Sequence, residues 1–340
     1  MQGLQPQEGG YLILIEPINK KRLVLFLAFA FGIAWLFSLV IALKGGLAQS
    51  PILIPELNLS LAAVLLAGGV MMAPALANLL ARALTREGKT DLWLRPARFE
   101  RPWRFWLLAW LLPAVGTILG AVLYFALFPS AFDQNLETLR ALLSSAAPDQ
   151  NISPWAYLLM NTLQALLLAP ILNALFCFGE EFGWRAYLLP RLLPLGTRRA
   201  VLLTGLIWGV WHAPVIAMGH NYGLDYPGAP WLGIVAMIWF CAALGTIFSW
   251  LTLKEGSVWP AVIGHGAING IAALGLVAQK GAPNTLLGPA PTGLIGGLFF
   301  TLLALVLLLK PGALAPGKEK WRPEPILLPQ DGEPNPPKPE

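Results

Sequence analysis

The stretch CFGEEFGWRAYLLPR, residues 177–191, contains two adjacent carboxylates, Glu180 and Glu181, followed by Arg185. It comes directly after an apolar run, residues 155–177, that contains no Asp, Glu, Lys or Arg. An ionisable side chain at membrane depth is costly, so it is a candidate functional residue whose partner lies elsewhere in the chain. The stretch therefore predicts a polar site inside a membrane-embedded helical bundle.

The composition of the chain also indicates a membrane protein. Of the 340 residues, 56% are hydrophobic and 12% are charged, about half the charged fraction of an average soluble domain. Apolar runs of about 20 residues recur, which is the length that an α-helix needs to cross a bilayer. The predicted fold class is all-α and polytopic, because a β-barrel would show short alternating segments instead. Cys177 and Cys241 lie in apolar runs and are expected to be packing residues without a disulfide.

Eight apolar segments are predicted to cross the membrane as helices. The fourth is longer than a bilayer requires, so it tilts, kinks at Pro170 or begins above the membrane, and Pro190 is expected to end it. The segments are about 23–43, 59–80, 105–128, 155–189, 200–218, 231–253, 258–278 and 292–309.

The basic residues predict how the bundle is oriented. Apart from Arg185, an eight-span topology leaves only Lys44, Arg140 and Lys280 outside and all other Lys and Arg on the cytoplasmic side. Both termini are then cytoplasmic, in a multi-pass protein of the cell membrane. The net charge of +5 follows from this topology, so no nucleic-acid partner is expected.

Four regions follow from the predicted spans. They are an N-terminal cytoplasmic segment (1–22), three membrane helices with their loops (23–154), a motif-bearing membrane core (155–310) and a disordered Pro-rich cytoplasmic tail (311–340).

Three ionisable residues on three predicted helices reach similar depths. Counted from the cytoplasmic helix ends at about 1.5 Å per residue, Glu180 lies roughly 14 Å in, His212 roughly 18 Å and His265 roughly 11 Å. Together with Glu180, Glu181 and Arg185, the two histidines are the only acidic, basic or imidazole side chains in the apolar segments. A solvated helix end and two packing histidines would explain each residue singly. Their shared depth favours one functional site in the inner half of the bilayer.

Spacing within each helix adds detail to this site. Glu181 and Arg185 are four residues apart, which allows an ion pair that lessens the cost of burying a charge. Glu180 points about 100° away from Glu181, so one carboxylate can face the site while the other pairs with Arg185. His265 and Asn269 are one helical turn apart.

These motifs resemble the CPBP family of CAAX prenyl endopeptidases and bacteriocin-processing proteins. The resemblance covers about 155–278 and includes the flanks 183–192 and 211–214, which are similar to the bacterial branch. Two positions depart from the family pattern: Trp208 stands where Phe is usual, and Ala186 stands where Gly is common. The motifs read Glu180-Glu181-x-x-x-Arg185, Trp208-x-x-x-His212 and His265-x-x-x-Asn269.

The resemblance implies an intramembrane endopeptidase whose peptide or protein substrate enters from the membrane lipids. Peptide hydrolysis needs an activated water, a proton shuttle and stabilisation of an oxyanion. Glu180 with His212 is expected to activate the water, directly or through a metal, and Glu181 with Arg185 to balance charge. His265 and Asn269 would complete a metal shell or donate hydrogen bonds to the oxyanion.

A divalent metal, most readily Zn²⁺, is one expectation for this site. Glu180, His212 and His265 form a two-histidine, one-carboxylate set of the kind used by hydrolytic zinc, with Asn269 as a fourth or outer group. In the competing account Glu180 and His212 activate water without metal, and His265 and Asn269 donate to the oxyanion.

Two functions from other classes were weighed against a protease. A non-catalytic scaffold or bacteriocin-immunity protein could keep the same fold and motifs. A proton-coupled transporter would show an internal repeat and charges spread over several helices, and neither is apparent. Aspartyl GxGD, zinc HExxH and serine GxSxG signatures are absent from the sequence. The sequence leaves the physiological substrate, prenylated or not, open.

Overall fold

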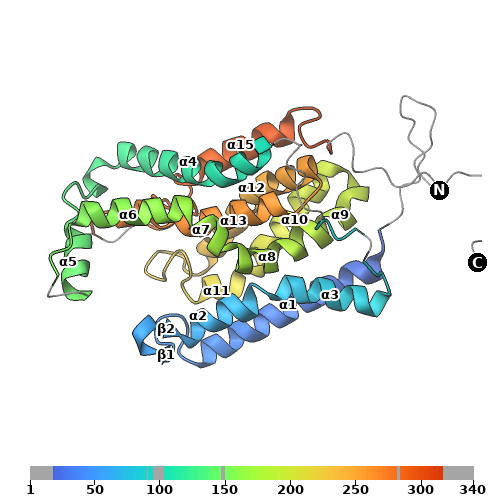
Figure 1. Cartoon of the computed structure of the whole chain (residues 1–340), viewed down its shortest axis with the longest axis horizontal. Coiled ribbons are helices and arrows are strands. Elements are labelled where there is room, and N and C mark those ends of the chain that lie inside the picture. The colour runs from blue at the N-terminus through green and yellow to red at the C-terminus, as the bar shows by residue number, and fades with distance from the viewer. Residues whose placement is uncertain (1–17, 90, 95–102, 147–149, 282–283, 317–340) are drawn as a thin grey trace, which may run out of the picture.

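The computed structural model describes residues 18–89, 91–94, 103–146, 150–281 and 284–316, which form an elongated helical bundle (Figure 1). The predicted N-terminal segment, the arginines of the 95–102 loop and the Pro-rich tail lie largely outside the described residues. The longer helices are α1 (Lys20–Leu43), α3 (Ala73–Thr85), α4 (Trp103–Leu127), α5 (Glu137–Ala146), α6 (Pro154–Leu167), α8 (Ala174–Gly183), α10 (Thr197–Trp211), α12 (Trp231–Glu255), α13 (Trp259–Ile271) and α15 (Leu298–Leu309).

Shorter elements connect these helices. Within the described residues the one sheet is a small antiparallel hairpin, β1 (Ile52–Ile54) with β2 (Leu59–Ser60), between α1 and α2. The short helical elements are η1 (Pro55–Leu57), α2 (Leu61–Leu65), η2 (Leu66–Val70), η3 (Pro129–Ala131), α7 (Ala169–Leu172), η4 (Trp184–Leu188), α9 (Leu189–Leu192), η5 (Leu193–Leu195), α11 (Ala213–Ala217) and α14 (Leu274–Val277).

The predicted all-α, multi-pass membrane fold is confirmed. Five helical stretches in the described part of the chain are long and apolar enough to cross a membrane. They are Lys20–Leu43, Leu61–Thr85, Trp103–Leu127, Trp231–Glu255 and Trp259–Val277. The other three predicted segments are also helical, but they are interrupted or shorter.

The fourth predicted segment is a broken helical path. It breaks at Leu168, next to Pro170, so the kink that the sequence offered as one alternative is present. The prediction that Pro190 ends the helix is wrong. Pro190 lies in the first turn of α9 and the path continues to Leu192. Proline is tolerated there because the first residues of a helix have no intrahelical acceptor for their N–H groups.

The eighth helix begins later than predicted. Residues 284–297 run mostly as turns, and α15 starts only at Leu298. The turn segment packs tightly against α4, where a Cβ atom at Gly120 would overlap the carbonyl oxygen of Gly296. The apolar character of this segment therefore reflects burial against α4 and not a continuous helix.

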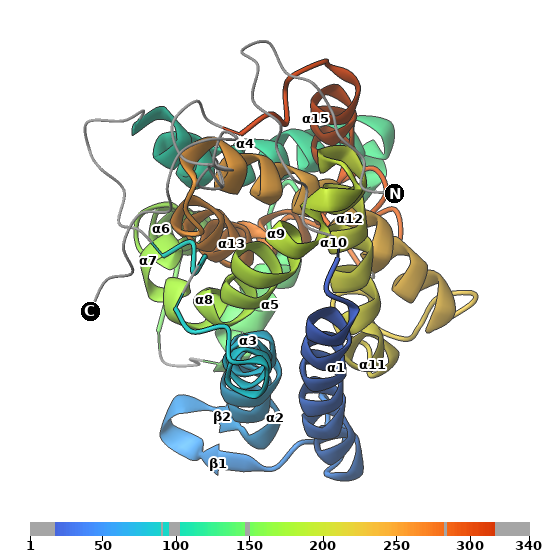
Figure 2. The same ribbon diagram turned by 90° about the vertical axis from the view of Figure 1, so that its right-hand side faces the viewer.

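The helices divide into a central bundle and a lateral pair. Helix α12 contacts α10, α13 and α15, while α13 also contacts α4 and α8. Helices α1 and α3 pack against each other and extend to one side of the bundle, as Figure 2 shows. The lateral pair reaches the bundle mainly through contacts between α3 and α8.

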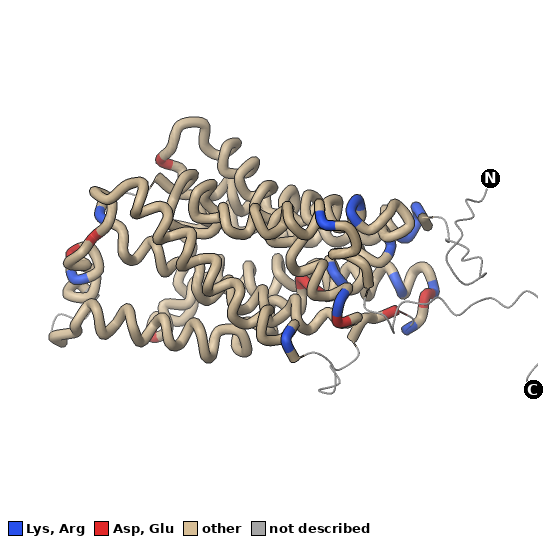
Figure 3. Tube along the Cα trace, turned by 90° about the horizontal axis from the view of Figure 1, so that it is seen from above, with Lys and Arg blue, Asp and Glu red and all other residues tan. Residues whose placement is uncertain are grey.

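Basic residues gather at one end of the molecule. Figure 3 shows most Lys and Arg positions at the end where α1 begins, with few at the opposite end. This asymmetry agrees with the charge bias in the sequence. The cytoplasmic placement of that end stays a prediction.

A cluster around Glu87, which we call the Glu87 cluster, joins several elements at the basic end. The Glu87 carboxylate accepts hydrogen bonds from the hydroxyls of Thr85 at 2.6 Å and Tyr187 at 2.8 Å, and from the guanidinium of Arg191. Arg22 of α1 lies 3.5 Å from the same carboxylate, whose side chain is 3% exposed. The cluster thereby ties α1 and the end of α3 to η4 and α9.

The hydrogen bonds of this cluster determine the protonation of Glu87. Burial acts to raise the pKa of Glu87, but the hydrogen bonds from Thr85, Tyr187 and Arg191 and the charge of Arg191 together hold its pKa below the ordinary value. The carboxylate is therefore ionised and paired at neutral pH.

Candidate active site

Helix α8 is held close to α3 by two glycines that flank the paired glutamates. A Cβ atom at Gly179 would lie 2.5 Å from the carbonyl oxygen of Met71, and one at Gly183 would overlap Pro74. Small residues one turn apart allow such close approach of two helix backbones in a membrane. The glycines thus fix the depth and rotation of the helix that carries Glu180 and Glu181.

The helix changes its winding directly after the glutamates. Residues Trp184–Leu188 form a π-helical turn, and π turns occur frequently at functional sites. The buried amide of Asn78 on α3 donates to the carbonyl of Phe182 at 2.8 Å, at the start of this turn. Arg185 lies within this π-helical turn, four residues after Glu181, and is fully buried.

Glu181 is the centre of a buried ion-pair network. Its Oε1 atom accepts from Nη1 of Arg185 at 3.0 Å and from Nδ1 of His265 at 2.8 Å. All three side chains are buried. Because a carboxylate only accepts hydrogen bonds, Nδ1 of His265 carries a proton and its Nε2 is the remaining acceptor when the ring is neutral.

The predicted Glu181–Arg185 pair is thereby present. The sequence had grouped His265 with Glu180, whereas its hydrogen-bond partner in the structure is Glu181.

Glu180 has a different partner from α10. The indole N–H of Trp208 donates to Oε2 of Glu180 at 2.6 Å, and both side chains are buried. Within the described residues, no Lys, Arg or His forms a salt bridge with the Glu180 carboxylate. The sequence noted Trp208 as the aromatic residue of its motif but missed this N–H donor. The spacing of four residues between Trp208 and His212 was the only sequence signal that Trp208 faces the site.

His212 is oriented by its own helix. Its Nδ1 atom lies 2.8 Å from the carbonyl oxygen of Trp208, one turn earlier, so Nδ1 carries the proton. The ring lies edge-on to the Trp208 ring at a centroid distance of 5.6 Å, and Nδ1 is 3.8 Å from the Sγ atom of Cys241. His212 is half-buried. Its Nε2 is therefore the nitrogen that can take part in proton transfer.

Asn269 lies one turn beyond His265 on α13. Its amide donates to the Sγ atom of buried Cys177 at 3.5 Å, and the Asn269 residue itself is exposed. Both cysteines are free and buried, as the sequence predicted. A second amide that sequence reasoning missed, that of Asn173, donates to the carbonyl of Gly266 at 3.0 Å and joins α8 to α13.

The metal set expected from the sequence is not assembled in this structure. Within the described ranges, no group of three or more His, Cys, Asp and Glu side chains has the arrangement of a metal site. Glu181 holds Nδ1 of His265, and one oxygen of Glu180 holds an indole N–H. As placed, Glu180, His212 and His265 do not form a shared metal site within the described residues.

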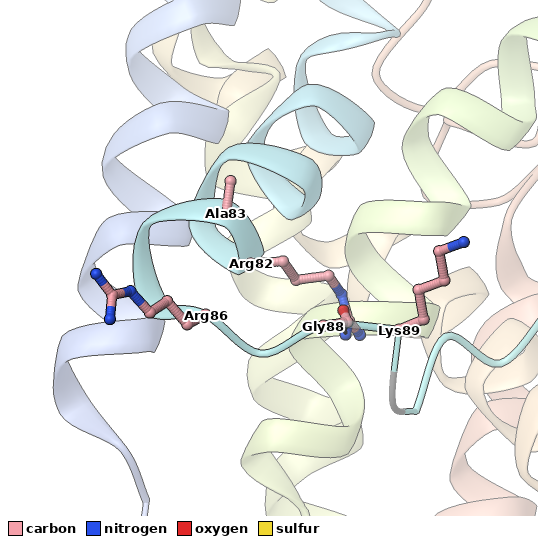
Figure 4. A pocket seen from close by; sticks show the side chains of 5 residues that line it. All are labelled: Arg82, Ala83, Arg86, Gly88 and Lys89. Atoms are coloured by element: carbon pink, nitrogen blue, oxygen red, sulfur yellow. Dashed lines mark hydrogen bonds between the residues drawn. The ribbon is translucent and has the colours of Figure 1, made fainter.

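A pocket of about 490 Å³ lies away from these residues, at the end of α3. Figure 4 shows Arg86 and Lys89 pointing to opposite sides of it. Arg82 is turned toward the protein, with hydrogen bonds to Asn78 Oδ1 at 2.7 Å and to the carbonyl of Asp91 at 3.1 Å. The cations lining this pocket therefore do not converge on one point. The lining residues are Arg82, Ala83, Arg86, Gly88 and Lys89.

The fold and the site together define a multi-pass helical membrane protein with a buried Glu, Arg and His centre. Residues 155–271, which contain all six predicted site residues, match the family model described as type II CAAX prenyl endopeptidase Rce1-like. The motif-based expectation is confirmed: this segment is similar to the CAAX prenyl endopeptidases of the CPBP family.

One curated relative shows the same similarity. The CAAX prenyl protease 2 of Methanococcus maripaludis is 31% identical over 93 residues, which are 26% of this chain and 34% of the relative. The chain thus spans about a third of the length of the curated relative that it matches.

Proposed function

We propose that this protein is an intramembrane endopeptidase of the cell membrane that hydrolyses a peptide bond of its substrate, with Glu180 as the central catalytic residue. One observation carries the proposal most strongly. Glu180 is 3% exposed and, among the described residues, has an indole N–H but no salt-bridge partner, whereas Glu181 beside it is paired with Arg185 and His265. A buried carboxylate without a cationic partner is suited to accept a proton.

In the proposed reaction Glu180 acts as the general base. It removes a proton from a water molecule while the water oxygen forms a bond to the carbonyl carbon of the substrate peptide. The electron pair of the C=O bond moves to the oxygen and gives a tetrahedral oxyanion. Asn269 is the proposed hydrogen-bond donor to this oxyanion, because oriented donors are the usual means of stabilising it. His212, whose Nε2 is the free acceptor, is proposed to orient the attacking water together with Glu180.

His265 is the proposed proton donor to the leaving amine. Glu181 holds Nδ1–H of His265, which leaves Nε2 to receive the proton that Glu180 took from water. His265 then passes a proton to the amine nitrogen as the oxyanion collapses, the C=O bond re-forms and the C–N bond breaks. Arg185 lies 3.0 Å from the Glu181 carboxylate and balances its charge. This division of roles uses two adjacent carboxylates for two tasks, because one is paired and the other is not.

The substrate is proposed to be a peptide or protein that reaches the site from the lipid. The name of the curated relative describes a protease of CAAX prenyl substrates, so a prenylated C-terminal peptide is the first class to test. An unprenylated transmembrane peptide is the second.

The test compares wild-type protein with Glu180→Gln in detergent micelles. The probes are an internally quenched farnesylated CAAX peptide and an unprenylated transmembrane peptide. We expect wild type to cleave at least one probe and Glu180→Gln to lose about a thousandfold in rate. Glu137→Gln, the same change at an exposed residue of α5, is the matched control and should retain activity.

Two outcomes would count against the proposal. Equal cleavage by wild type and Glu180→Gln would remove Glu180 from the reaction. If wild type cleaves neither probe, while an in-cell phenotype persists in Glu180→Gln, the alternative of a non-catalytic scaffold or immunity protein takes its place. Comparison of membrane and secreted peptides from cells with and without Glu180 then identifies the natural substrate.

A further inference from the structure

We infer that Trp208 is a positioning residue whose indole N–H holds one oxygen of Glu180 and leaves the other oxygen to act on water. This inference rests on the proposed function, since it concerns how the proposed base is oriented. The hydrogen bond from Nε1 to Oε2 is 2.6 Å long and joins two buried side chains on different helices. Within the described residues, no other hydrogen bond or salt bridge to the Glu180 carboxylate is present.

The ring of Trp208 also covers Arg185. The guanidinium carbon lies 4.4 Å from the centroid of the Trp208 ring and 5.4 Å from the centroid of the Phe248 ring. Within the described residues, Nε and Nη2 of Arg185 make no hydrogen bonds. The aromatic face therefore provides the main contact for the part of the cation that Glu181 does not bind.

Both histidines of the site touch the same indole. The ring centroids of His212 and His265 lie 5.6 Å and 5.4 Å from that of Trp208. One side chain thus contacts the proposed base, the buried cation and both imidazoles.

Two glycines of α10 keep this indole in place. Gly205 and Gly209 flank Trp208, and both face the backbone of α12. A Cβ atom at Gly205 would lie 2.8 Å from Cα of Ala242, and one at Gly209 would overlap Ile238. Helix α10 therefore cannot rotate or withdraw without separating from α12, and the N–H of Trp208 stays aimed at Glu180.

A phenyl ring at position 208 would keep an aromatic face but lose the donor. This makes Trp208→Phe the direct test, together with replacement by benzothienylalanine, which keeps the two-ring shape and puts sulfur in place of N–H. We expect kcat on the cleaved probe to fall about tenfold to a hundredfold in both variants, as for loss of a hydrogen bond to a charged group. KM should stay within about twofold, because the role inferred for the indole is to hold Glu180 and not to bind substrate.

Trp110→Phe is the matched control. Its indole donates to the carbonyl of Leu166 at 2.6 Å, between α4 and α6, so the variant loses a bond of equal length away from Glu180. We expect kcat for Trp110→Phe to remain near the wild-type value. An equal fall in both variants would show a general effect on packing and overturn the inference.

Combining changes shows whether Trp208 acts through Glu180. In a Glu180→Asp background the carboxylate is one methylene shorter and out of reach of the indole. Trp208→Phe should then reduce the residual kcat by less than about twofold. A full tenfold reduction in that background would mean that Trp208 acts by another route.

The contact can be read without any activity. In protein labelled with ¹⁵N at the indole nitrogens, the Trp208 signal is the one that disappears in Trp208→Phe. Glu180→Gln should move this signal and leave the Trp110 signal unchanged. An unmoved Trp208 signal overturns the inference, whereas failure of wild type to cleave either probe with a moved signal counts against the proposed function alone.

Discussion

Two carboxylate clusters contact the same helical run, residues 174–192, and they differ in how completely their charge is satisfied. Glu87, at the basic end, is bound by Thr85, Tyr187 and Arg191 and faces Arg22. In the interior, Glu180 accepts the N–H of Trp208 and has no salt-bridge partner within the described residues. A carboxylate that is bound by cationic partners joins elements together, whereas one without a cationic partner is suited to exchange a proton.

In its contacts, Glu181 resembles Glu87 more than it resembles its neighbour Glu180. It is fully buried and bound by Arg185 and His265. Adjacent residues in one helix therefore fall into different classes because their side chains point to different neighbours. The comparison separates residues that hold the fold from residues that are proposed to act on substrate, and each prediction below tests that separation.

The largest expected effects contrast His265 with Arg185. His265→Ala should reduce kcat about a hundredfold to ten-thousandfold by removing a proton carrier, while the yield of folded protein stays near wild type. Arg185→Ala leaves Glu181 as an uncompensated buried charge, which costs about 3–5 kcal/mol and should lower the folded yield. Size-exclusion chromatography in detergent and cleavage assays per folded molecule measure both. Equal losses of yield would mean that the separation between the two residues is wrong.

A smaller effect is expected at Glu87. Glu87→Gln keeps the size of the side chain but removes its charge, and it should lower the free energy of unfolding by about 1–3 kcal/mol. Activity per folded molecule should not change, because the cluster lies outside the site. Thermal unfolding in detergent is the measurement, with exposed Glu137→Gln as the matched control.

The same residue predicts a pH dependence. Because the pKa of Glu87 is lower in the folded protein than its ordinary 4.5, its contribution to stability is present above pH 4.5 and is lost as the pH falls through the lowered pKa. Wild type should therefore lose thermal stability below pH 4.5 more steeply than Glu87→Gln. Parallel curves for the two proteins would place the acid sensitivity elsewhere.

Chelation should have little effect. Since Glu180, His212 and His265 as placed do not fit a metal ion, we expect cleavage by protein treated with a chelator to stay within about twofold of the untreated rate. Metal content of the purified protein and of a His212→Ala, His265→Ala double variant provides the second measurement. Loss of cleavage on chelation with recovery on zinc addition would show that the three side chains come together during the reaction, as the sequence had suggested.

The orientation of the bundle can be checked without changing its activity. Reporter fusions at Arg198 and Lys254 should read cytoplasmic, and a fusion at Asp225 should read outside. Arg95 and Asp149, which the same topology places inside and outside, lie beyond the described residues. An outside reading at Arg198 would place the Glu87 cluster on the other face of the membrane.

Spacing and apolar pattern were sufficient to predict the helical class. The roles of the six candidate site residues stay predictions. The Glu181–Arg185 pair followed from a separation of four residues in one helix, which is a local property. Contacts between different helices could not be predicted from the spacing of residues within one helix. The bond from Trp208 to Glu180 depends on the rotation of α10 against α8, and the partner of His265 depends on which carboxylate faces α13.

Two helix boundaries were also set by packing and not by local preference. Pro190 lies in the first turn of α9, where a backbone N–H has no intrahelical acceptor. Proline, which lacks this N–H, is tolerated there, so the helical path continues past Pro190. Residues before α15 are apolar because they cover α4.

The close contact that Gly179 and Gly183 allow between α8 and α3 limits how the chain can be shortened. The family-matched segment, residues 155–271, does not include α3, yet Gly179 and Gly183 lie against Met71, Met72 and Pro74. A protein cut down to the matched segment would expose the side of α8 that these residues cover. We therefore expect the smallest unit that folds with its paired glutamates in place to be larger than the matched segment.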